Sequence, residues 1–237
     1  MNASNTPNVG ICGRSGQTGR VLVLPGIMNV KFHLAWFKRM IRRAYPFYEV
    51  EVQRWGTPFG SIANLQAYER NRRTAEELAR QIGKYRETHP GAMIHLVGYS
   101  GGGGLAVMVA EALEAPASIH RLILVAAAVS PQYPLADKVL PKVREFAVNY
   151  ASRYDVQIRQ GTTFFGNMDG VKQPGAGAVG FSLQHPKLIQ VHWRKEMLRY
   201  LHLGNHWGYL SPLWQRRYLL PALDPSADAS SLERKLA

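Results

Sequence analysis

A serine between two glycines, Gly98-x-Ser100-x-Gly102, carries the clearest chemical signal in the sequence. This spacing fits a sharp strand-to-helix turn that lifts a serine hydroxyl out of a sheet, where it can act as a nucleophile. An apolar run over residues 93–97 precedes the motif, and a helical pattern over Leu105–Leu113 follows it, as such a turn requires. Glycines on both sides let the strand and the helix approach without a Cβ clash.

The alternative interpretation of this segment is a glycine-rich loop that cradles a phosphate, since four glycines follow Ser100 directly. A P-loop requires Gly-Lys followed by Ser or Thr, and a dinucleotide-binding loop requires Gly-x-Gly-x-x-Gly; neither pattern begins at Gly98. We therefore predict that Ser100 is a nucleophile.

A serine nucleophile needs donors for the negative charge that develops on the substrate oxygen, an oxyanion hole. One donor is expected to be the backbone N–H of Gly101, the residue after the nucleophile. The other is expected after the first predicted strand, where Pro25-Gly26 precedes Ile27. The predicted donor is the Ile27 N–H, with Met28 beside it, and Pro25-Gly26 can end the strand as well.

The base that activates such a serine is a histidine late in the chain, because these sites follow the order Ser, Asp or Glu, His. Four of the eight histidines satisfy that order: His185, His192, His202 and His206. His206 lies in a turn, Gly-Asn-His-Trp-Gly, between the last predicted strand and the last predicted helix, whereas His192 falls within a predicted strand and His202 at a predicted helix end. The predicted base is His206.

The acid that orients the histidine should follow the strand after Leu122–Val129. Glu145–Ala151 reads as that strand, and Asp155 comes shortly after it. Asp169 is the alternative acid, and would require Thr162–Phe165 to be the strand instead. Either aspartate could also be a turn residue that binds its own backbone.

Short apolar runs alternate with helical patterns, which predicts an α/β fold with a mostly parallel central sheet of about six strands and helices on both faces. Residues 1–19 are expected to be a flexible leader, 20–222 one domain, and 223–237 a tail without a core of its own. Strands are predicted at Val21–Leu24, Tyr48–Trp55, Ile94–Val97, Leu122–Val129, Glu145–Ala151 and Leu188–Trp193. Helices are predicted at Leu34–Ala44, Ile62–Glu87, Leu105–Leu113, Ala136–Arg144 and Leu213–Leu220, with an irregular segment over residues 160–180.

The chain is strongly basic, with 29 Lys and Arg against 16 Asp and Glu and a formal charge of +13. These cations are scattered and form no run of five, which favours a basic enzyme surface over a nucleic-acid-binding one. Cys12 is the only cysteine, so an intramolecular disulfide and a cysteine cluster for zinc are excluded, and no metal or cofactor is predicted. The leader lacks the apolar region of a secretory signal, and no apolar run is long enough to span a bilayer, so a cytoplasmic location is expected.

The motif around Ser100, the early Pro25-Gly26 turn and the late His206 together make the chain resemble the α/β-hydrolase superfamily over about Val21–Leu220. It also resembles a bacterial subgroup of hydrolase-like proteins with the segments Trp55-Gly-Thr-Pro, Ser130-Pro-Gln-Tyr and Ser152-x-x-Asp155. The resemblance favours Asp155 as the acid. It implies hydrolysis of an ester, thioester or lipid acyl group through an acyl-enzyme, on a version of the fold that lacks the usual first strands and a large lid.

Two other functions fit the same residues. An acyltransferase would use the same Ser, His and Asp with an alcohol or thiol as acceptor. A catalytically silent module of this fold could instead bind an anionic surface, since residues 34–43 form an amphipathic, cationic helix. Such a helix more often packs its apolar face on a sheet.

Overall fold

Six parallel strands form the centre of the part of the chain that the computed structural model describes, residues 19–27, 31–56 and 61–236. They are β1 (Gly19–Leu24), β2 (Tyr48–Val52), β3 (Ile94–Tyr99), β4 (Ile119–Val125), β5 (Val143–Ala151) and β6 (Leu188–His192). Their order in the sheet is β2-β1-β3-β4-β5-β6. The inner strands are almost entirely buried and apolar, as expected when helices cover both faces. The predicted α/β architecture is confirmed.

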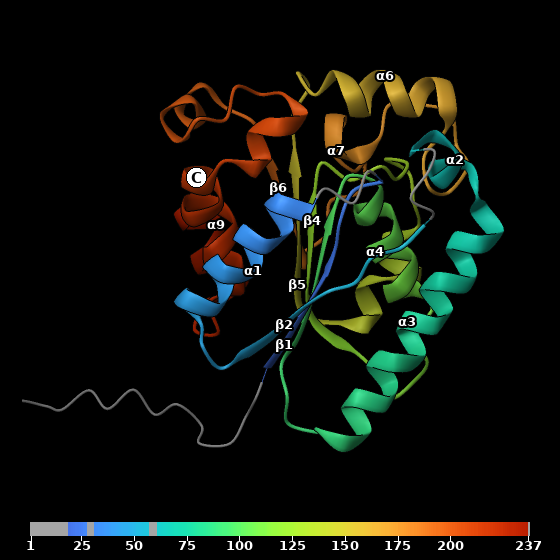
Figure 1. The fold of residues 1–237 in the computed structure, drawn as a ribbon, viewed down its shortest axis with the longest axis vertical. Coiled ribbons are helices and arrows are strands. Elements are labelled where there is room, and N and C mark those ends of the chain that lie inside the picture. Colours follow the sequence, from blue (N-terminus) through green and yellow to red (C-terminus); the bar gives the residue numbers. More distant parts are fainter. Residues whose placement is uncertain (1–18, 28–30, 57–60, 237) are drawn as a thin grey trace, which may run out of the picture.

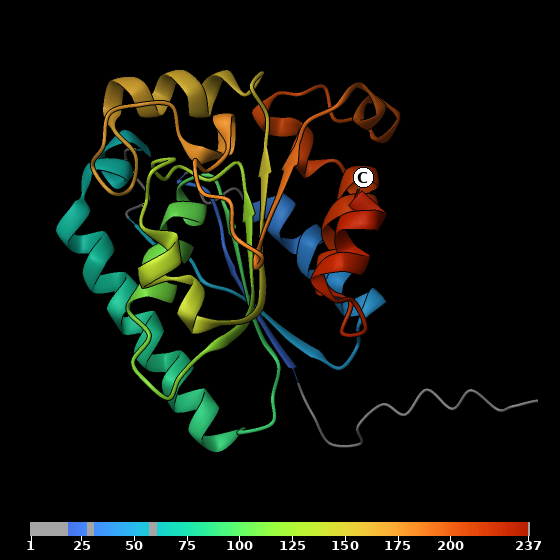
Figure 2. The ribbon, with the colours of Figure 1, turned by 180° about the vertical axis from the view of Figure 1, so that it is seen from behind.

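Helices cover the two faces of the sheet in separate pairs (Figures 1 and 2). One face carries α1 (Lys31–Ala44) and α9 (Ala229–Leu236), and the other carries α3 (Tyr68–Thr88) and α4 (Gly101–Glu111). In α1, Phe37, Met40 and Ile41 are buried while Arg39 and Arg42 are exposed. The apolar side of this cationic helix is therefore packed in the core.

Shorter helices lie across the carboxyl ends of the strands, at the top of Figure 1. They are α2 (Ser61–Gln66), α6 (Val156–Phe165) and α7 (Ala176–Val179). The chain runs from β1 outward to β2 and then returns to the other side of β1 as β3. Ligands of open parallel sheets bind where the strand order reverses in this way, so the carboxyl ends of β1 and β3 mark the place for a site.

Several predicted elements differ from the observed ones. The helix predicted over Ile62–Glu87 is interrupted at Ala67, whose backbone leaves the helical region (φ −80°, ψ 59°). The expectation that the segment 160–180 is irregular is wrong at its start, where α6 extends to Phe165, and near its end, where α7 lies, and it holds for residues 166–175. Asp155 caps α6 by accepting a hydrogen bond from the Ile158 N–H. The predicted helix 136–144 is replaced by α5 (Leu135–Lys138), a 3-10 turn and the start of β5.

The carboxyl-terminal segment is packed on the sheet. After α8 (Pro212–Trp214), a π-helical turn (Gln215–Leu219) and a 3-10 turn (Leu220–Leu223) replace the single helix predicted there. Arg121 of β4, which is 1% exposed, donates hydrogen bonds to the carbonyls of Ala222, Asp224 and Ala227 at 2.6–3.0 Å. Leu232 and Leu236 of α9 are buried in the same core as the strands. Residues 223–236, expected as a tail, thus contribute to that core.

The expected leader and Cys12 lie outside the described residues. Among the helices of the described ranges, none combines the length and the apolar character needed to cross a bilayer.

Buried histidines should make the stability of the fold depend on pH. Burial lowers the pKa of His202 and of His120 from 6.5 to about 4, and lowers the pKa of His95 well below its ordinary value. Below pH 6.5 the unfolded chain then takes up protons that the folded chain does not, so stability present at higher pH is lost as the pH falls toward about 4. We expect the free energy of unfolding, measured by urea titration, to be roughly 1–3 kcal/mol lower at pH 5 than at pH 7.5. His120→Gln should reduce this difference, and equal stability at the two pH values would contradict the account.

Candidate active site

Ser100 lies at the turn between β3 and α4 in a backbone conformation that few residues adopt (φ 57°, ψ −125°). Three backbone hydrogen bonds hold it there. Its N–H donates to the Val125 carbonyl at 2.9 Å, and its own carbonyl accepts from the N–H groups of Gly103 and Ala128 at 2.9 and 3.0 Å. A strained backbone conformation persists only where the surrounding contacts hold it in place, and such conformations are common at active sites.

The glycines of the motif are explained by the close approach of α4 to the ends of the strands. A Cβ on Gly102 would overlap the backbone carbonyls of Leu24 and Pro25, and one on Gly98 would overlap the backbone of Gly102 and Gly103. A Cβ on Gly104 would lie 2.6 Å from the Ala128 carbonyl oxygen. The glycines after Ser100 are therefore needed for packing, which accounts for them without a phosphate.

His206 faces Ser100 from the beginning of a 3-10 helix, His206–Leu210 (η3). Its Nε2 lies 3.1 Å from the Ser100 hydroxyl oxygen. Asn205 positions the turn, since its side chain accepts a hydrogen bond from the Gly208 N–H at 2.9 Å. Of the other late histidines, His202 is buried and its Nδ1 accepts from the Gly204 N–H at 3.0 Å, which gives it a place in the packing beneath this turn.

Asp155, His206 and Ser100 form a chain of hydrogen bonds. Asp155 Oδ2 accepts from His206 Nδ1 at 2.6 Å, while its Oδ1 accepts from the Ile158 N–H at 3.0 Å as the cap of α6. The carboxylate is fully buried. Asp169, the alternative acid, is bonded instead to the Ser130 hydroxyl and backbone N–H. The structure thus brings Asp155, and not Asp169, to His206.

Tyr99 supports the histidine, a role that the sequence did not reveal. Its ring stacks on the His206 ring with centroids 4.9 Å apart, and its hydroxyl donates to the His206 carbonyl at 2.9 Å. Burial, with a contribution from the charge of Asp155, raises the pKa of Tyr99, so the hydroxyl keeps its proton. In the sequence, only the position of Tyr99 next to Ser100 could have indicated this role, because Tyr99 and His206 are 107 residues apart.

The two segments predicted to supply an oxyanion hole, the turn after β1 and the start of α4, lie next to the serine. Helix α4 begins at Gly101, so the Gly101 N–H is among the amides at the helix start that have no partner within the helix. A Cβ on Gly26 would lie 3.2 Å from the Ser100 Cβ, and the Ile27 side chain lies against Gly101. Met28 lies outside the described residues.

A cavity of about 520 Å³ opens directly at Ser100 and His206. None of its described lining residues is Asp, Glu, Lys or Arg. The walls come from the turn after β1, from α2, from α6 and from η3, and they include Ile27, Leu65, Val156, Phe164, Phe165 and Trp207.

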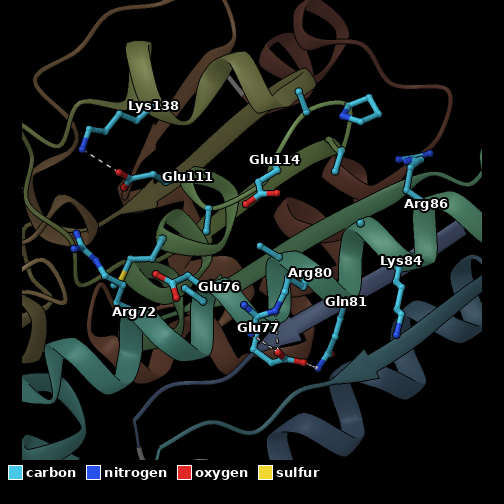
Figure 3. A pocket seen from close by; sticks show the side chains of 18 of the residues that line it. Arg72, Glu76, Glu77, Arg80, Gln81, Lys84, Arg86, Glu111, Glu114 and Lys138 are labelled. Carbon is cyan, nitrogen blue, oxygen red and sulfur yellow. Dashed lines mark hydrogen bonds and ion pairs between the residues drawn. The ribbon is translucent and has the colours of Figure 1, made fainter.

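A second, larger hollow of about 1430 Å³ lies between α3 and the loop after α4 (Figure 3). Charges of both signs line it, and some are paired, as in Glu111 with Lys138 at 2.9 Å and Glu77 with Arg80 at 2.6 Å. Ser100, His206 and Asp155 are not part of its lining. The described residues contain no group of three or more His, Cys, Asp or Glu side chains that could hold a metal ion.

Comparisons with known proteins find a family model and solved structures that are similar to this chain. A family model described as serine aminopeptidase, S33, matches residues 56–175, about half of the chain. No protein with a curated description matches. Among solved structures, a cutinase-like protein from Cryptococcus sp. has 13% identity and a TM-score of 0.43, covering 90% of this chain and 98% of its own. The catalytic core domain of acetyl xylan esterase from Trichoderma reesei has 14% identity and a TM-score of 0.46, covering 84% and 95%.

Replacement of Gly102 by alanine should destabilise the protein by about 2 kcal/mol or more, because the new methyl group has no space against the carbonyls of Leu24 and Pro25. Gly83 of α3 is the matched control, since a Cβ there meets nothing within 4 Å. Gly83→Ala should raise the free energy of unfolding by roughly 0.5–1 kcal/mol, as helix propensity dictates. Thermal or urea unfolding of both variants measures the difference. Equal effects of the two substitutions would contradict the packing explanation.

Two substitutions of Asp155 distinguish its contact with His206 from its contact with the Ile158 N–H. Asp155→Asn keeps an oxygen for the Ile158 N–H but favours the wrong histidine tautomer, so turnover of any substrate should fall about 10⁴-fold while the fold persists. Asp155→Ala should also lower the unfolding free energy, by about 1 kcal/mol, through loss of the helix cap. Asp169→Asn is the control and should keep activity. An Asp169→Asn variant as inactive as Asp155→Asn would show that the acid is misassigned.

Proposed function

Because the chain belongs to the serine aminopeptidase S33 family of α/β-hydrolases, we propose that it is a serine hydrolase that cleaves carboxylic esters with an apolar acyl group. The observation that carries the proposal is the hydrogen-bonded chain of Ser100, His206 and Asp155 at a cavity whose described lining holds no Asp, Glu, Lys or Arg.

In the first half of the reaction, the Ser100 hydroxyl oxygen attacks the carbonyl carbon of the ester while His206 Nε2 takes its proton. The imidazolium that forms is stabilised by the Asp155 carboxylate, which also holds Nδ1–H in place. The tetrahedral intermediate collapses when the bond to the alcohol oxygen breaks. His206 then returns the proton to the departing alcohol, which leaves an acyl group on Ser100.

In the second half, water enters in place of the alcohol and gives a proton to His206 as its oxygen attacks the acyl carbon. The bond to Ser100 breaks, the serine regains its proton from His206, and a carboxylic acid is released. In both halves the Gly101 and Ile27 N–H groups stabilise the negative carbonyl oxygen. The start of α4 contributes its positive dipole end on the Gly101 side.

The lining of the cavity supports an apolar ester over an amino-terminal peptide. An aminopeptidase has to bind a charged α-amino group, and a buried ammonium needs a carboxylate partner. The described lining has no Asp or Glu, and Asp155 is already engaged by His206 and Ile158. Aliphatic and aromatic side chains of α2, α6 and η3 instead offer contacts to a hydrocarbon chain.

The proposal predicts hydrolysis of p-nitrophenyl butyrate, hexanoate and octanoate, without hydrolysis of aminoacyl p-nitroanilides. Ser100→Ala should lower kcat on the esters by about 10³-fold or more. Ser130→Ala removes another buried serine hydroxyl and should leave ester turnover within a few fold of the unsubstituted protein. Faster cleavage of the anilides than of every ester would overturn the choice of substrate. Ester turnover that survives Ser100→Ala would overturn the mechanism.

A further inference from the structure

Large apolar side chains at the mouth of the cavity point partly to solvent. Phe164 is 69% exposed, Val156 53%, Trp207 46%, Ile62 45% and Phe165 39%. All five also line the cavity. We refer to these five residues as the apolar rim. A substrate inside the cavity would cover only their inner sides, so the outer surface of the rim requires a separate explanation.

The rim is continuous although its residues come from three separate elements. Ile62 belongs to α2, Val156, Phe164 and Phe165 to α6, and Trp207 to η3. The Gln66 side chain joins α2 to α6 by donating to the Phe165 carbonyl at 3.2 Å. Figure 1 shows α2 and α6 together across the carboxyl ends of the strands, on the outside of the molecule.

Cations outnumber acids around the rim. The segments 61–66, 156–165 and 206–214 contain no Asp or Glu, and their one charged residue is Arg159, which is exposed. Exposed Arg153 precedes α6, and exposed Arg73 lies near the start of α3, the helix that follows α2, together with exposed Glu69. Arg72 belongs to the separate hollow of Figure 3 and is not part of this surface. The whole chain carries a formal charge of +13. An apolar patch of Phe, Trp, Ile and Val with cations around it has the composition of a surface that binds a lipid–water interface with anionic headgroups.

We propose that the apolar rim docks on an anionic lipid surface and that the substrate is a lipid ester which enters the cavity from that surface. The identity of the substrate rests on the proposed function, whereas docking does not. Phe164 and Trp207 enter the boundary between headgroups and acyl chains, and the nearby arginines bind the headgroups. The mouth of the cavity then opens into the lipid layer, so a hydrocarbon chain can reach Ser100 without passing through water. In the described part of the cationic helix α1, Phe37, Met40 and Ile41 are packed in the core and are not available for this contact.

Vesicle flotation tests docking separately from catalysis. The full chain carrying Ser100→Ala is mixed with vesicles of phosphatidylcholine alone, or with about 30% phosphatidylglycerol added, and the fraction that floats is measured. We expect binding to the anionic vesicles that weakens at 0.5 M salt. Phe164→Ser with Trp207→Ser should lower the apparent affinity about tenfold or more, since burial of one such side chain is worth at least that factor.

Phe47→Ser is the matched control, because Phe47 is 40% exposed but lies just before β2, at the opposite end of the sheet. It should leave flotation unchanged, provided that circular dichroism shows all variants folded.

No flotation with either vesicle would overturn the proposal, as would an equal loss of flotation in the Phe47 variant. A dimer in solution that the rim substitutions dissociate would show that the rim binds a second copy instead. Flotation of the Ser100→Ala protein together with absence of ester turnover in the unsubstituted one would retain docking and reject the proposed hydrolase.

Discussion

The close approach of α4 to the carboxyl ends of β1, β3 and β4 is the constraint on which the rest of the site depends. Backbone carbonyls of Leu24, Pro25 and Ala128 occupy the positions that side chains at Gly102 and Gly104 would need. This packing forces the tight turn at Ser100, with its positive φ, and three backbone hydrogen bonds hold that turn. The serine hydroxyl is thereby directed toward His206, and the first amide of α4 is placed beside it.

Asp155 connects this turn to the cavity. One carboxylate oxygen binds His206 and the other caps α6, so a single residue orients the base and fixes the start of the helix that covers the site. That helix supplies Val156, Phe164 and Phe165 to the cavity and its rim. The proposed chemistry and the proposed lipid contact therefore depend on the same short segment. A shift of α6 would affect both the apolar walls and the proton transfer at His206.

The sequence was most informative where a residue's role is set by its neighbours in the chain. Buried parallel strands appear as apolar runs, and the sharp turn appears as glycines around Ser100, so the sheet and the place of the serine could be predicted. The order of elements also led to His206, which the structure places next to Ser100, and to Asp155, which it places next to His206. The helix α6 was missed because its glycine and threonines obscure the pattern, although Asp155 is a typical helix cap. Tyr99 and Arg121 could not be assigned, because each acts through carbonyls about 100 residues away.

The central claim is that Ser100 is an activated nucleophile, and covalent labelling by a fluorophosphonate probe tests it most directly. The account predicts a single adduct by intact mass, mapped to the peptide containing Ser100 and absent from Ser100→Ala. The rate of labelling should also fall in Asp155→Asn, because the histidine can then no longer take the serine proton. A folded protein that forms no adduct, or one that is labelled at another residue, would contradict the account.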